Sequence, residues 1–153
     1  MKTFKELLIE LRACSIAIEW AEDKTIEQVV EQCHRGDWLL WLAARVDVGI
    51  QPLTLAKGHC ANTVRHLMKD ERSIKAVDAA IAFGEGKLSK EDLDAAYADA
   101  CAASDAYAAA EAYTAATYAD KAKNQMQTAN ICRKYIGDLI INKVNELLNT
   151  KDK

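Results

Sequence analysis

The feature that most constrains this chain is a short, almost uninterrupted apolar run that holds two of its three tryptophans. The run, residues 38–44, lies in the segment 33–45, which reads Cys-His-Arg-Gly-Asp-Trp-Leu-Leu-Trp-Leu-Ala-Ala-Arg. Arg35-Gly36 predicts a turn and Asp37 predicts an N-cap, so a helix should begin here. Both faces of that helix would be apolar, and the face with the two tryptophans would also carry Arg45. We therefore expect a buried helix that other elements surround.

Trp38 and Trp41 should contribute strongly to the stability of the fold. A buried tryptophan removes about 200 Å² from water, which is worth about 5 kcal/mol at about 25 cal/mol per Å², as an upper bound. Loss of either ring should therefore be severe.

Arg45, at the end of the run, must reach solvent or find a carboxylate, because a buried guanidinium without a partner is very unfavourable. One interpretation is a structural ion pair. The other makes Arg35, Asp37 and Arg45 part of a ligand or partner site.

Length and composition favour a single helical domain that covers residues 1–153. The 153 residues are enough to bury one core, and half of them are apolar. One proline and six glycines provide little of the turn punctuation that sheet proteins need. No apolar run approaches membrane-spanning length, and charges near the N-terminus interrupt any signal-peptide pattern. The predicted fold is all-α, a bundle of about six to seven helices.

Apolar residues at helical spacing, together with capping signals, predict where the helices lie. Thr25 with Gln28 forms a capping box, Pro52 suits the first residue of a helix, and Ser89 is an N-cap before first-turn acids. Besides the tryptophan helix, the expected helices are residues 3–21, a short segment after Thr25, residues 52–69, 72–83 and 93–122, and a last segment that includes 126–147.

The expected helix at 93–122 is about half alanine and is punctuated by tyrosines. Alanine is the strongest helix former, and small side chains let neighbouring helices approach closely. Tyr97 and Tyr107 would fill gaps between helices or, alternatively, line a pocket. Since no glycine or proline occurs at 87–136, an unbroken helix would reach roughly 70 Å, whereas the radius of gyration of a compact domain is about 15 Å. We expect a break at 120–124, or else a helix that projects to form a homodimer.

Charge is unevenly distributed, although the net charge is only −3. Residues 91–120 hold seven acids and no lysine or arginine, so the rest of the chain, with 20 basic and 16 acidic side chains, carries +4. An acidic helix face would repel nucleic acid and attract a basic protein. The alternative is an ordinary solvated face. We expect neither a nucleic-acid nor a membrane partner.

The remaining reactive side chains form no recognisable motif. Five cysteines are spread along the chain without a Cys-x-x-Cys pair, and we interpret them as reduced core thiols of a cytoplasmic protein. His59, Asn62 and His66 share a helix face but lack the companion ligands of a zinc site, so surface or capping histidines are favoured over a metal. No phosphate loop, nucleophile elbow or HExxH motif occurs, so we expect no cofactor and no enzymatic activity.

Several segments, taken together, resemble one protein family. They are Arg12-Ala13-Cys14, Trp20-Ala21, the core at 35–42, the alanine- and tyrosine-rich stretch, and residues 130–136 (Asn-Ile-Cys-Arg-Lys-Tyr-Ile). In this order, over about residues 11–136, they are similar to the fifth-type immunity proteins of bacterial polymorphic toxin systems and phages. The resemblance implies an all-α protein without catalytic activity that binds and neutralises another molecule.

Two functions follow from these patterns as hypotheses. The first is an immunity protein that neutralises a toxin or effector by direct binding, with the acidic stretch steering a basic partner and tyrosines as anchors. The second is a phage anti-defence protein that sequesters a small signalling nucleotide. Its pocket would join Trp38 or Trp41 to Arg35, Arg45 or His59. The complete set of candidate binding residues is Arg35, Asp37, Trp38, Trp41, Arg45, His59, Tyr97 and Tyr107.

Overall fold

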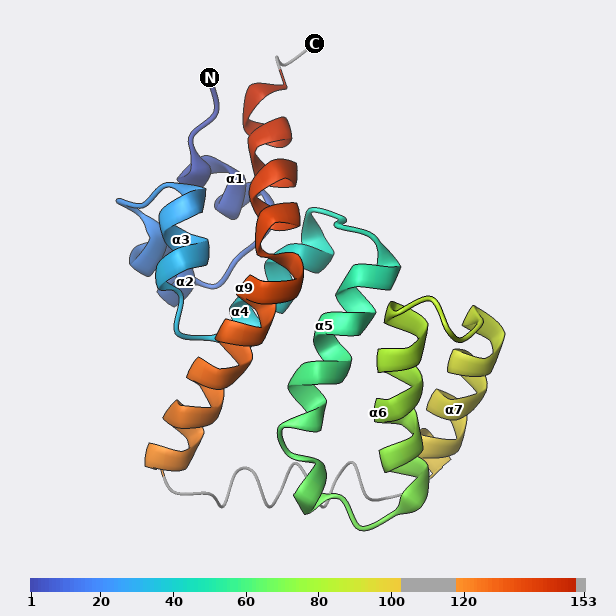
Figure 1. The fold of residues 1–153 in the computed structure, drawn as a ribbon. Coiled ribbons are helices and arrows are strands. Elements are labelled where there is room, and N and C mark those ends of the chain that lie inside the picture. Colours follow the sequence, from blue (N-terminus) through green and yellow to red (C-terminus); the bar gives the residue numbers. More distant parts are fainter. Residues whose placement is uncertain (103–117, 151–153) are drawn as a thin grey trace.

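The computed structural model describes residues 1–102 and 118–150, and every regular element in these ranges is a helix (Figure 1). The α-helices are α1 (Phe4–Glu10), α2 (Ser15–Ala21), α3 (Ile26–Gln32), α4 (Gly36–Arg45), α5 (Ile50–Asn62), α6 (Glu71–Gly84), α7 (Lys90–Ala102) and α9 (Tyr118–Asn149). A 3-10 turn, η1 (Arg65–Leu67), lies between α5 and α6. The all-α prediction is confirmed. The helices of the described ranges exceed the expected number because one expected helix is divided in two.

The longest helix of the described ranges, α9, is the axis of the fold. It packs against α3, α4 and α5, and a row of α5, α6 and α7 extends away from it (Figure 1). One stripe of α9 is completely buried and recurs every three or four residues, at Ala129, Cys132, Ile136, Ile140 and Val144. This spacing is that of an amphipathic helix whose apolar stripe faces the core.

Helices α4 and α9 come into close contact at Gly36. A Cβ atom at this position would lie 2.3 Å from the Thr128 hydroxyl oxygen and 2.7 Å from the Thr128 backbone carbonyl carbon. The Cys132 thiol also donates to the Gly36 carbonyl oxygen at 3.6 Å. Only glycine leaves enough space here. The predicted turn and Asp37 N-cap are therefore wrong: Gly36 is the first helical residue, and Arg35 is the N-cap without a side-chain capping bond.

The helix expected at 3–21 is divided into α1 and α2 by a corner at Arg12, whose φ of 64° lies in the left-handed region. The Arg12 N–H donates to the Ile9 carbonyl oxygen at 3.0 Å, and the Ala13 N–H donates to that of Leu8 at 2.9 Å. These two bonds form a Schellman motif, which usually places glycine in the left-handed position. The prediction failed because arginine is a good helix former and signals no such turn.

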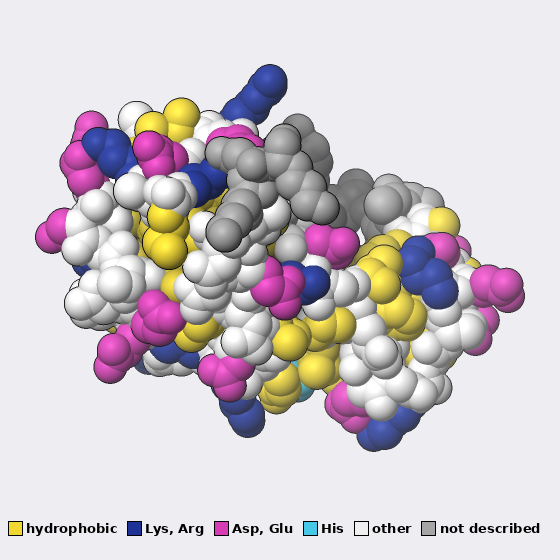
Figure 2. Space-filling model, turned by 90° about the horizontal axis from the view of Figure 1, so that it is seen from above, with side chains coloured by type: hydrophobic (Ala, Val, Ile, Leu, Met, Phe, Trp, Pro, Cys, Tyr) yellow, Lys and Arg dark blue, Asp and Glu magenta, His cyan; other side chains and the backbone are white. Residues whose placement is uncertain are grey.

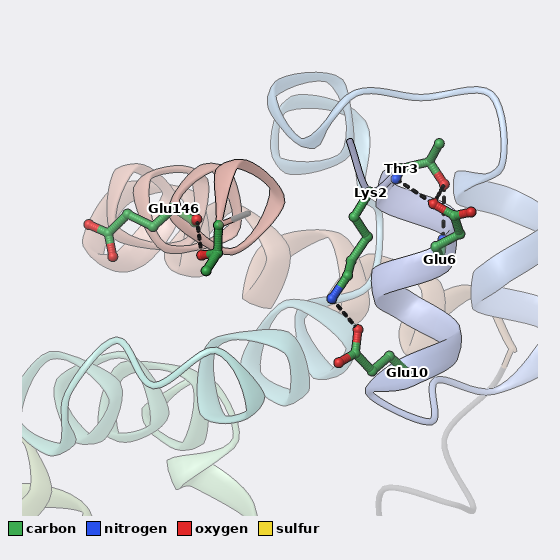
Figure 3. Close-up of polar contacts among 6 residues, drawn as sticks. Lys2, Thr3, Glu6, Glu10 and Glu146 are labelled. Carbon is green, nitrogen blue, oxygen red and sulfur yellow. Dashed lines mark hydrogen bonds and ion pairs between the residues drawn. The ribbon is translucent and has the colours of Figure 1, made fainter. Parts of the chain in front are cut away.

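Side-chain capping begins several helices, as the sequence indicates. In α1 the Glu6 N–H donates to the Thr3 hydroxyl at 3.2 Å, and the Thr3 N–H donates to the Glu6 carboxylate at 2.7 Å (Figure 3). These bonds with Thr3 lower the pKa of Glu6. Lys2 and Glu10 form an ion pair along the same helix (Figure 3). The capping box predicted for α3 and the serine cap predicted for α7 are both present.

The bounds of α5 differ from the predicted ones, whereas those of α6 agree with them. Helix α5 begins at Ile50 and ends at Asn62, so Pro52 lies within its first turn, and the α-helix does not continue to residue 69 as expected. Helix α6 agrees with the prediction within a residue at each end, and Asp70 caps it by accepting from the Arg72 N–H at 2.9 Å.

The break expected at 120–124 does not occur, because α9 runs through these residues without interruption. The Asn124 amide, one of the polar groups that suggested a break, donates to the Thr63 hydroxyl at 2.9 Å. This bond ties α9 to the end of α5. The first part of the alanine-rich stretch forms α7. Residues 103–117 lie outside the described residues.

On the face seen from above, acidic and basic side chains of the described residues are interspersed with exposed hydrophobic atoms (Figure 2). Three isoleucines that are more than half exposed, Ile9, Ile16 and Ile50, belong to three different helices. Within residues 1–102 and 118–150, no helix combines the length and apolar character needed to cross a membrane.

Candidate functional site

A cavity of about 340 Å³ opens on the side of α4 that carries its tryptophans, and we call it the tryptophan cavity. Its volume falls within the range of about 300–1,000 Å³ that is usual for small-molecule sites. The lining is mostly apolar and comes from α1 to α4 and the corner at Arg12. The lining residues are Phe4, Leu8, Arg12, Ala13, Cys14, Ala17, Trp20, Ala21, Val29, Cys33, Asp37, Trp38, Trp41 and Leu42.

Trp20, Trp38 and Trp41 all line this cavity. The ring centroids of Trp20 and Trp38 are 6.0 Å apart, and the His34 ring lies 6.0 Å from each of them. All three tryptophans are only half-buried, whereas Leu39 on the other side of α4 is fully buried. The prediction of a helix buried all round is therefore wrong for the tryptophan face, because these rings border a cavity rather than another packed layer.

A cation lies over each tryptophan ring. The distances to the ring centroids are 4.8 Å for Lys24 over Trp20, 4.6 Å for Arg35 over Trp38 and 5.5 Å for Arg45 over Trp41. Such contacts contribute about 0.5–1 kcal/mol each at exposed sites. Arg45 itself is exposed, and within the described residues its partner is the Trp41 ring rather than a carboxylate. The ion pair considered for Arg45 is thus replaced by a cation–π contact.

Arg35 and Asp37 form a bidentate ion pair at the start of α4. The Arg35 Nε lies 3.1 Å from Asp37 Oδ1, and Nη2 lies 2.5 Å from Oδ2. Burial raises the pKa of Asp37, but the hydrogen bond and charge of Arg35 outweigh it, so the pKa lies below its ordinary value. An ionised carboxylate, balanced by a guanidinium, therefore stands at the cavity wall.

The corner between α1 and α2 brings Arg12 and Cys14 to the tryptophan cavity. A left-handed conformation costs a residue other than glycine about 1–2 kcal/mol, and retained strain of this kind clusters at functional sites. Cys14 is exposed, which corrects the expectation of a core thiol at this position. Cys33, Cys60 and Cys132 are buried as expected, and the side chain of the fifth cysteine lies outside the described residues.

Two of the buried thiols, Cys33 and Cys132, are structural, whereas the hydrogen bond with Cys132 lowers the pKa of Cys60. The Sγ atoms of Cys60 and Cys132 lie 3.9 Å apart between α5 and α9. Contact with Cys60, together with burial, raises the pKa of Cys132, and burial raises the pKa of Cys33. Thiols with raised pKa values stay protonated at neutral pH and behave as small apolar side chains.

A second cavity, of about 320 Å³, lies between α4, α5 and α9, and we call it the polar cavity. Asp37 lines both cavities, so the two share a wall at the start of α4. The residues that line the polar cavity are Arg35, Asp37, Leu40, Cys60, Lys121, Asn124, Gln125 and Thr128.

The other predicted site residues lie elsewhere. His59 stacks on Tyr135, with ring centroids 4.5 Å apart and an interplanar angle of 5°. Tyr97 of α7 lies over a groove of α5 and α6, and burial raises its pKa. Tyr107 lies outside the described residues. No group of three or more His, Cys, Asp or Glu side chains suited to a metal ion occurs in the part of the chain that the structure describes.

The structure thus brings together Arg35, Asp37, Trp38 and Trp41 from the predicted set and adds Trp20 and Arg12, which sequence reasoning missed. The helical spacing places Trp20 only near the end of the first expected helix. Its position in the cavity depends on the corner at Arg12, for which the local pattern offers no signal.

Comparisons with protein-family models, curated proteins and solved structures found no match to this chain. The relation to the fifth-type immunity proteins stays a prediction.

Proposed function

We propose that this protein acts by binding rather than by catalysis, and that it takes a small, flat ligand in the tryptophan cavity. The observation that carries the proposal is the cavity of about 340 Å³ lined by Trp20, Trp38 and Trp41. Indole rings offer large, rigid apolar faces at low entropic cost, and they stack favourably on other planar groups. A cavity with three of them suits an aromatic ligand better than an aliphatic one.

Charge around the cavity favours a ligand with some negative charge. Arg12 lines the cavity, and Lys24, Arg35 and Arg45 lie over its tryptophan rings. Asp37 is the carboxylate of the lining, and Arg35 balances it. An aromatic ligand that carries an anionic group, such as a nucleotide derivative, fits this pattern. This is the sequestration function that the sequence offers as the alternative to an immunity protein, with Arg12 in the place given to Arg45 or His59.

Tryptophan fluorescence and saturation-transfer NMR with a panel of aromatic and heteroaromatic fragments test the proposal. Because all three tryptophans line the cavity, a bound ring should alter their emission. Trp38→Leu should abolish binding. Tyr135→Leu removes a ring that lines neither cavity and should leave binding intact. If no fragment binds, or if both variants weaken binding equally, the proposal fails.

A second candidate is the immunity function, in which the protein neutralises a toxin or effector by direct binding. It is supported by the family resemblance and by α7, where Glu91, Asp92, Asp94 and Asp99 are all exposed. Lys90 pairs with Asp94 at 2.6 Å and balances only part of this charge. An exposed acidic helix raises the association rate with a basic partner.

Native mass spectrometry of the protein isolated from its own cells or from infected lysate separates the two candidates. A co-purifying species of small mass supports the ligand proposal, whereas a co-purifying protein supports the immunity function. In the latter case, joint replacement of Asp94 and Asp99 by Asn should slow association and flatten its salt dependence. Unchanged association would contradict a role for α7.

A further inference from the structure

The polar cavity and the tryptophan cavity have one lining residue in common, Asp37. The Arg35 guanidinium lies over the Trp38 ring at 4.6 Å and holds Asp37 in a bidentate pair. The residue that the two cavities share is therefore held in place by an ion pair. A ligand that extends from one cavity into the other would pass the Asp37 carboxylate.

Asp37 retains the capacity to accept further hydrogen bonds. A carboxylate offers about four acceptor positions, the contacts with Arg35 use one on each oxygen, and backbone N–H groups of Asp37 and Trp38 also contribute to lowering its pKa. Since Arg35 lowers the pKa of Asp37, the group is ionised at neutral pH and accepts without donating. Its natural partner is a hydroxyl or N–H group of a ligand.

The opposite wall of the polar cavity comes from one face of α9. Asn124 donates to Thr63 at 2.9 Å, which fixes the orientation of its amide. Gln125 is half-buried and lines the cavity beside Lys121. The side chains of Lys121, Asn124 and Gln125 supply hydrogen-bond donors and acceptors to the polar cavity, and Asp37 supplies a carboxylate on the side of α4.

The chemistry of these walls selects among ligand groups. A hydrocarbon would leave the Gln125 amide without a partner in the cavity, which is unfavourable. A bare anion has no proton to donate to the Asp37 carboxylate, which can only accept. A group that carries several hydroxyls both donates to the carboxylate and accepts from the amides, and carboxylates of this kind hold ribose hydroxyls in dinucleotide-binding folds.

We infer that the polar cavity is a second subsite of the same binding site, and that its ligand is nucleoside-like: a flat heteroaromatic group against Trp38, joined to a hydroxylated sugar against Asp37 and Gln125. The inference rests on the proposed ligand-binding function and names its ligand class. Nothing in it requires catalysis. It predicts that base and sugar contribute to affinity through different cavities.

Isothermal titration calorimetry with matched pairs of free base and nucleoside tests the inference, using adenine and adenosine, guanine and guanosine, cytosine and cytidine, and uracil and uridine. At least one nucleoside should bind about tenfold or more tightly than its base, as expected for one or two good hydrogen bonds. Gln125→Leu should remove most of that difference and leave the affinity for the base unchanged. Gln127→Leu, the same change at an exposed position of α9, is the control and should have no effect.

The outcomes separate this inference from the proposed function. Equal affinities for base and nucleoside, or an unchanged difference in Gln125→Leu, overturn the nucleoside-like ligand but leave the tryptophan cavity as a ligand site. The same holds if aromatic fragments bind and no nucleoside does. If the aromatic fragments also fail to bind, both the nucleoside-like ligand and the tryptophan cavity as a ligand site are overturned. Circular dichroism melting curves establish that each variant is folded before titration.

Discussion

The guanidinium of Arg133 donates to the backbone carbonyl oxygen of Cys33 at 2.6 Å, across a sequence separation of 100 residues. The same nitrogen, Nη1, donates to the Val30 carbonyl oxygen at 3.0 Å. Arg133 of α9 therefore caps the carboxyl end of α3, where carbonyl groups have no partner within the helix. This contact holds α3 against α9, and α3 contributes Val29 to the tryptophan cavity.

Replacement of Arg133 by Met should lower the free energy of unfolding by about 2–4 kcal/mol, since bonds from charged donors contribute about 1.5–3 kcal/mol each and are not fully additive. Methionine retains the apolar part of the arginine side chain, so the decrease in the free energy of unfolding measures the contribution of the hydrogen bonds. Urea denaturation measures the change. Lys134→Met, at the next and exposed position, loses a cation–π contact with the Tyr135 ring and should lower stability by no more than about 1 kcal/mol. Equal effects of the two variants would contradict the capping role.

Gly36→Ala should destabilise the fold by about 1–3 kcal/mol or more, because the added methyl group meets Thr128 on a neighbouring helix. Gly137→Ala is the comparison. Its Cβ would lie 3.1 Å from the Val30 Cγ1, the end of a side chain, and alanine gains up to about 1 kcal/mol of helix propensity there. Thermal melts of the two variants should differ clearly. A mild Gly36→Ala variant would mean that α4 and α9 can separate at no great cost.

Arg12→Gly should make the corner between α1 and α2 more stable by about 1 kcal/mol, because glycine adopts the left-handed conformation without strain. The same change removes a cation from the tryptophan cavity and should weaken any anionic aromatic ligand found in the fragment screen. Melting temperature and ligand affinity should therefore move in opposite directions. In Arg45→Gln, which alters a cation outside the lining, affinity should fall less. Loss of both stability and affinity in Arg12→Gly would contradict this role.

Stability should depend on Asp70 in acid. The hydrogen bonds from the Arg72 side chain and backbone lower the pKa of Asp70 to about 2. Because the folded-state pKa lies below the unfolded value of about 4, the contribution is present above pH 4 and is lost as pH falls toward about 2. Urea midpoints of the wild type and Asp70→Asn should differ at pH 7 and converge near pH 2. Asp70→Ala, which loses the N-cap acceptor as well as the charge, should lie below Asp70→Asn at pH 7.

Cys14 should react with a thiol reagent well before the buried cysteines. It is exposed, whereas Cys33, Cys60 and Cys132 are buried and the pKa values of Cys33 and Cys132 are raised. Mass spectrometry after brief treatment with iodoacetamide identifies the modified site. Because Cys14 lines the tryptophan cavity, a bound ligand should slow its modification. Modification of Cys132 at a comparable rate would mean that the core opens locally.

Features that depend on neighbours a few residues away can be predicted from the sequence alone. The helical class follows from apolar spacing, the cap of α3 follows from Thr25 and Gln28, and α6 lies within a residue of its expected bounds. The sequence also identifies two of the tryptophans and the Arg35–Asp37 pair as candidates, because unusual residue types close together are visible in the chain itself. In each case the responsible interactions span one or two helical turns.

The way these helices meet depends on contacts between distant segments, which the local pattern does not contain. At Arg12 the chain turns where the sequence predicts a continuous helix. Gly36 lies within α4, where its missing side chain leaves room for Thr128 of α9. Trp20 lines a cavity that α4 also borders. The sequence predicts more burial for the tryptophan helix than the structure shows, because apolar composition does not reveal whether another helix packs against each of its faces. Cavities arise from the residual mismatch between packed helices, and that mismatch is a property of the whole arrangement rather than of any local segment.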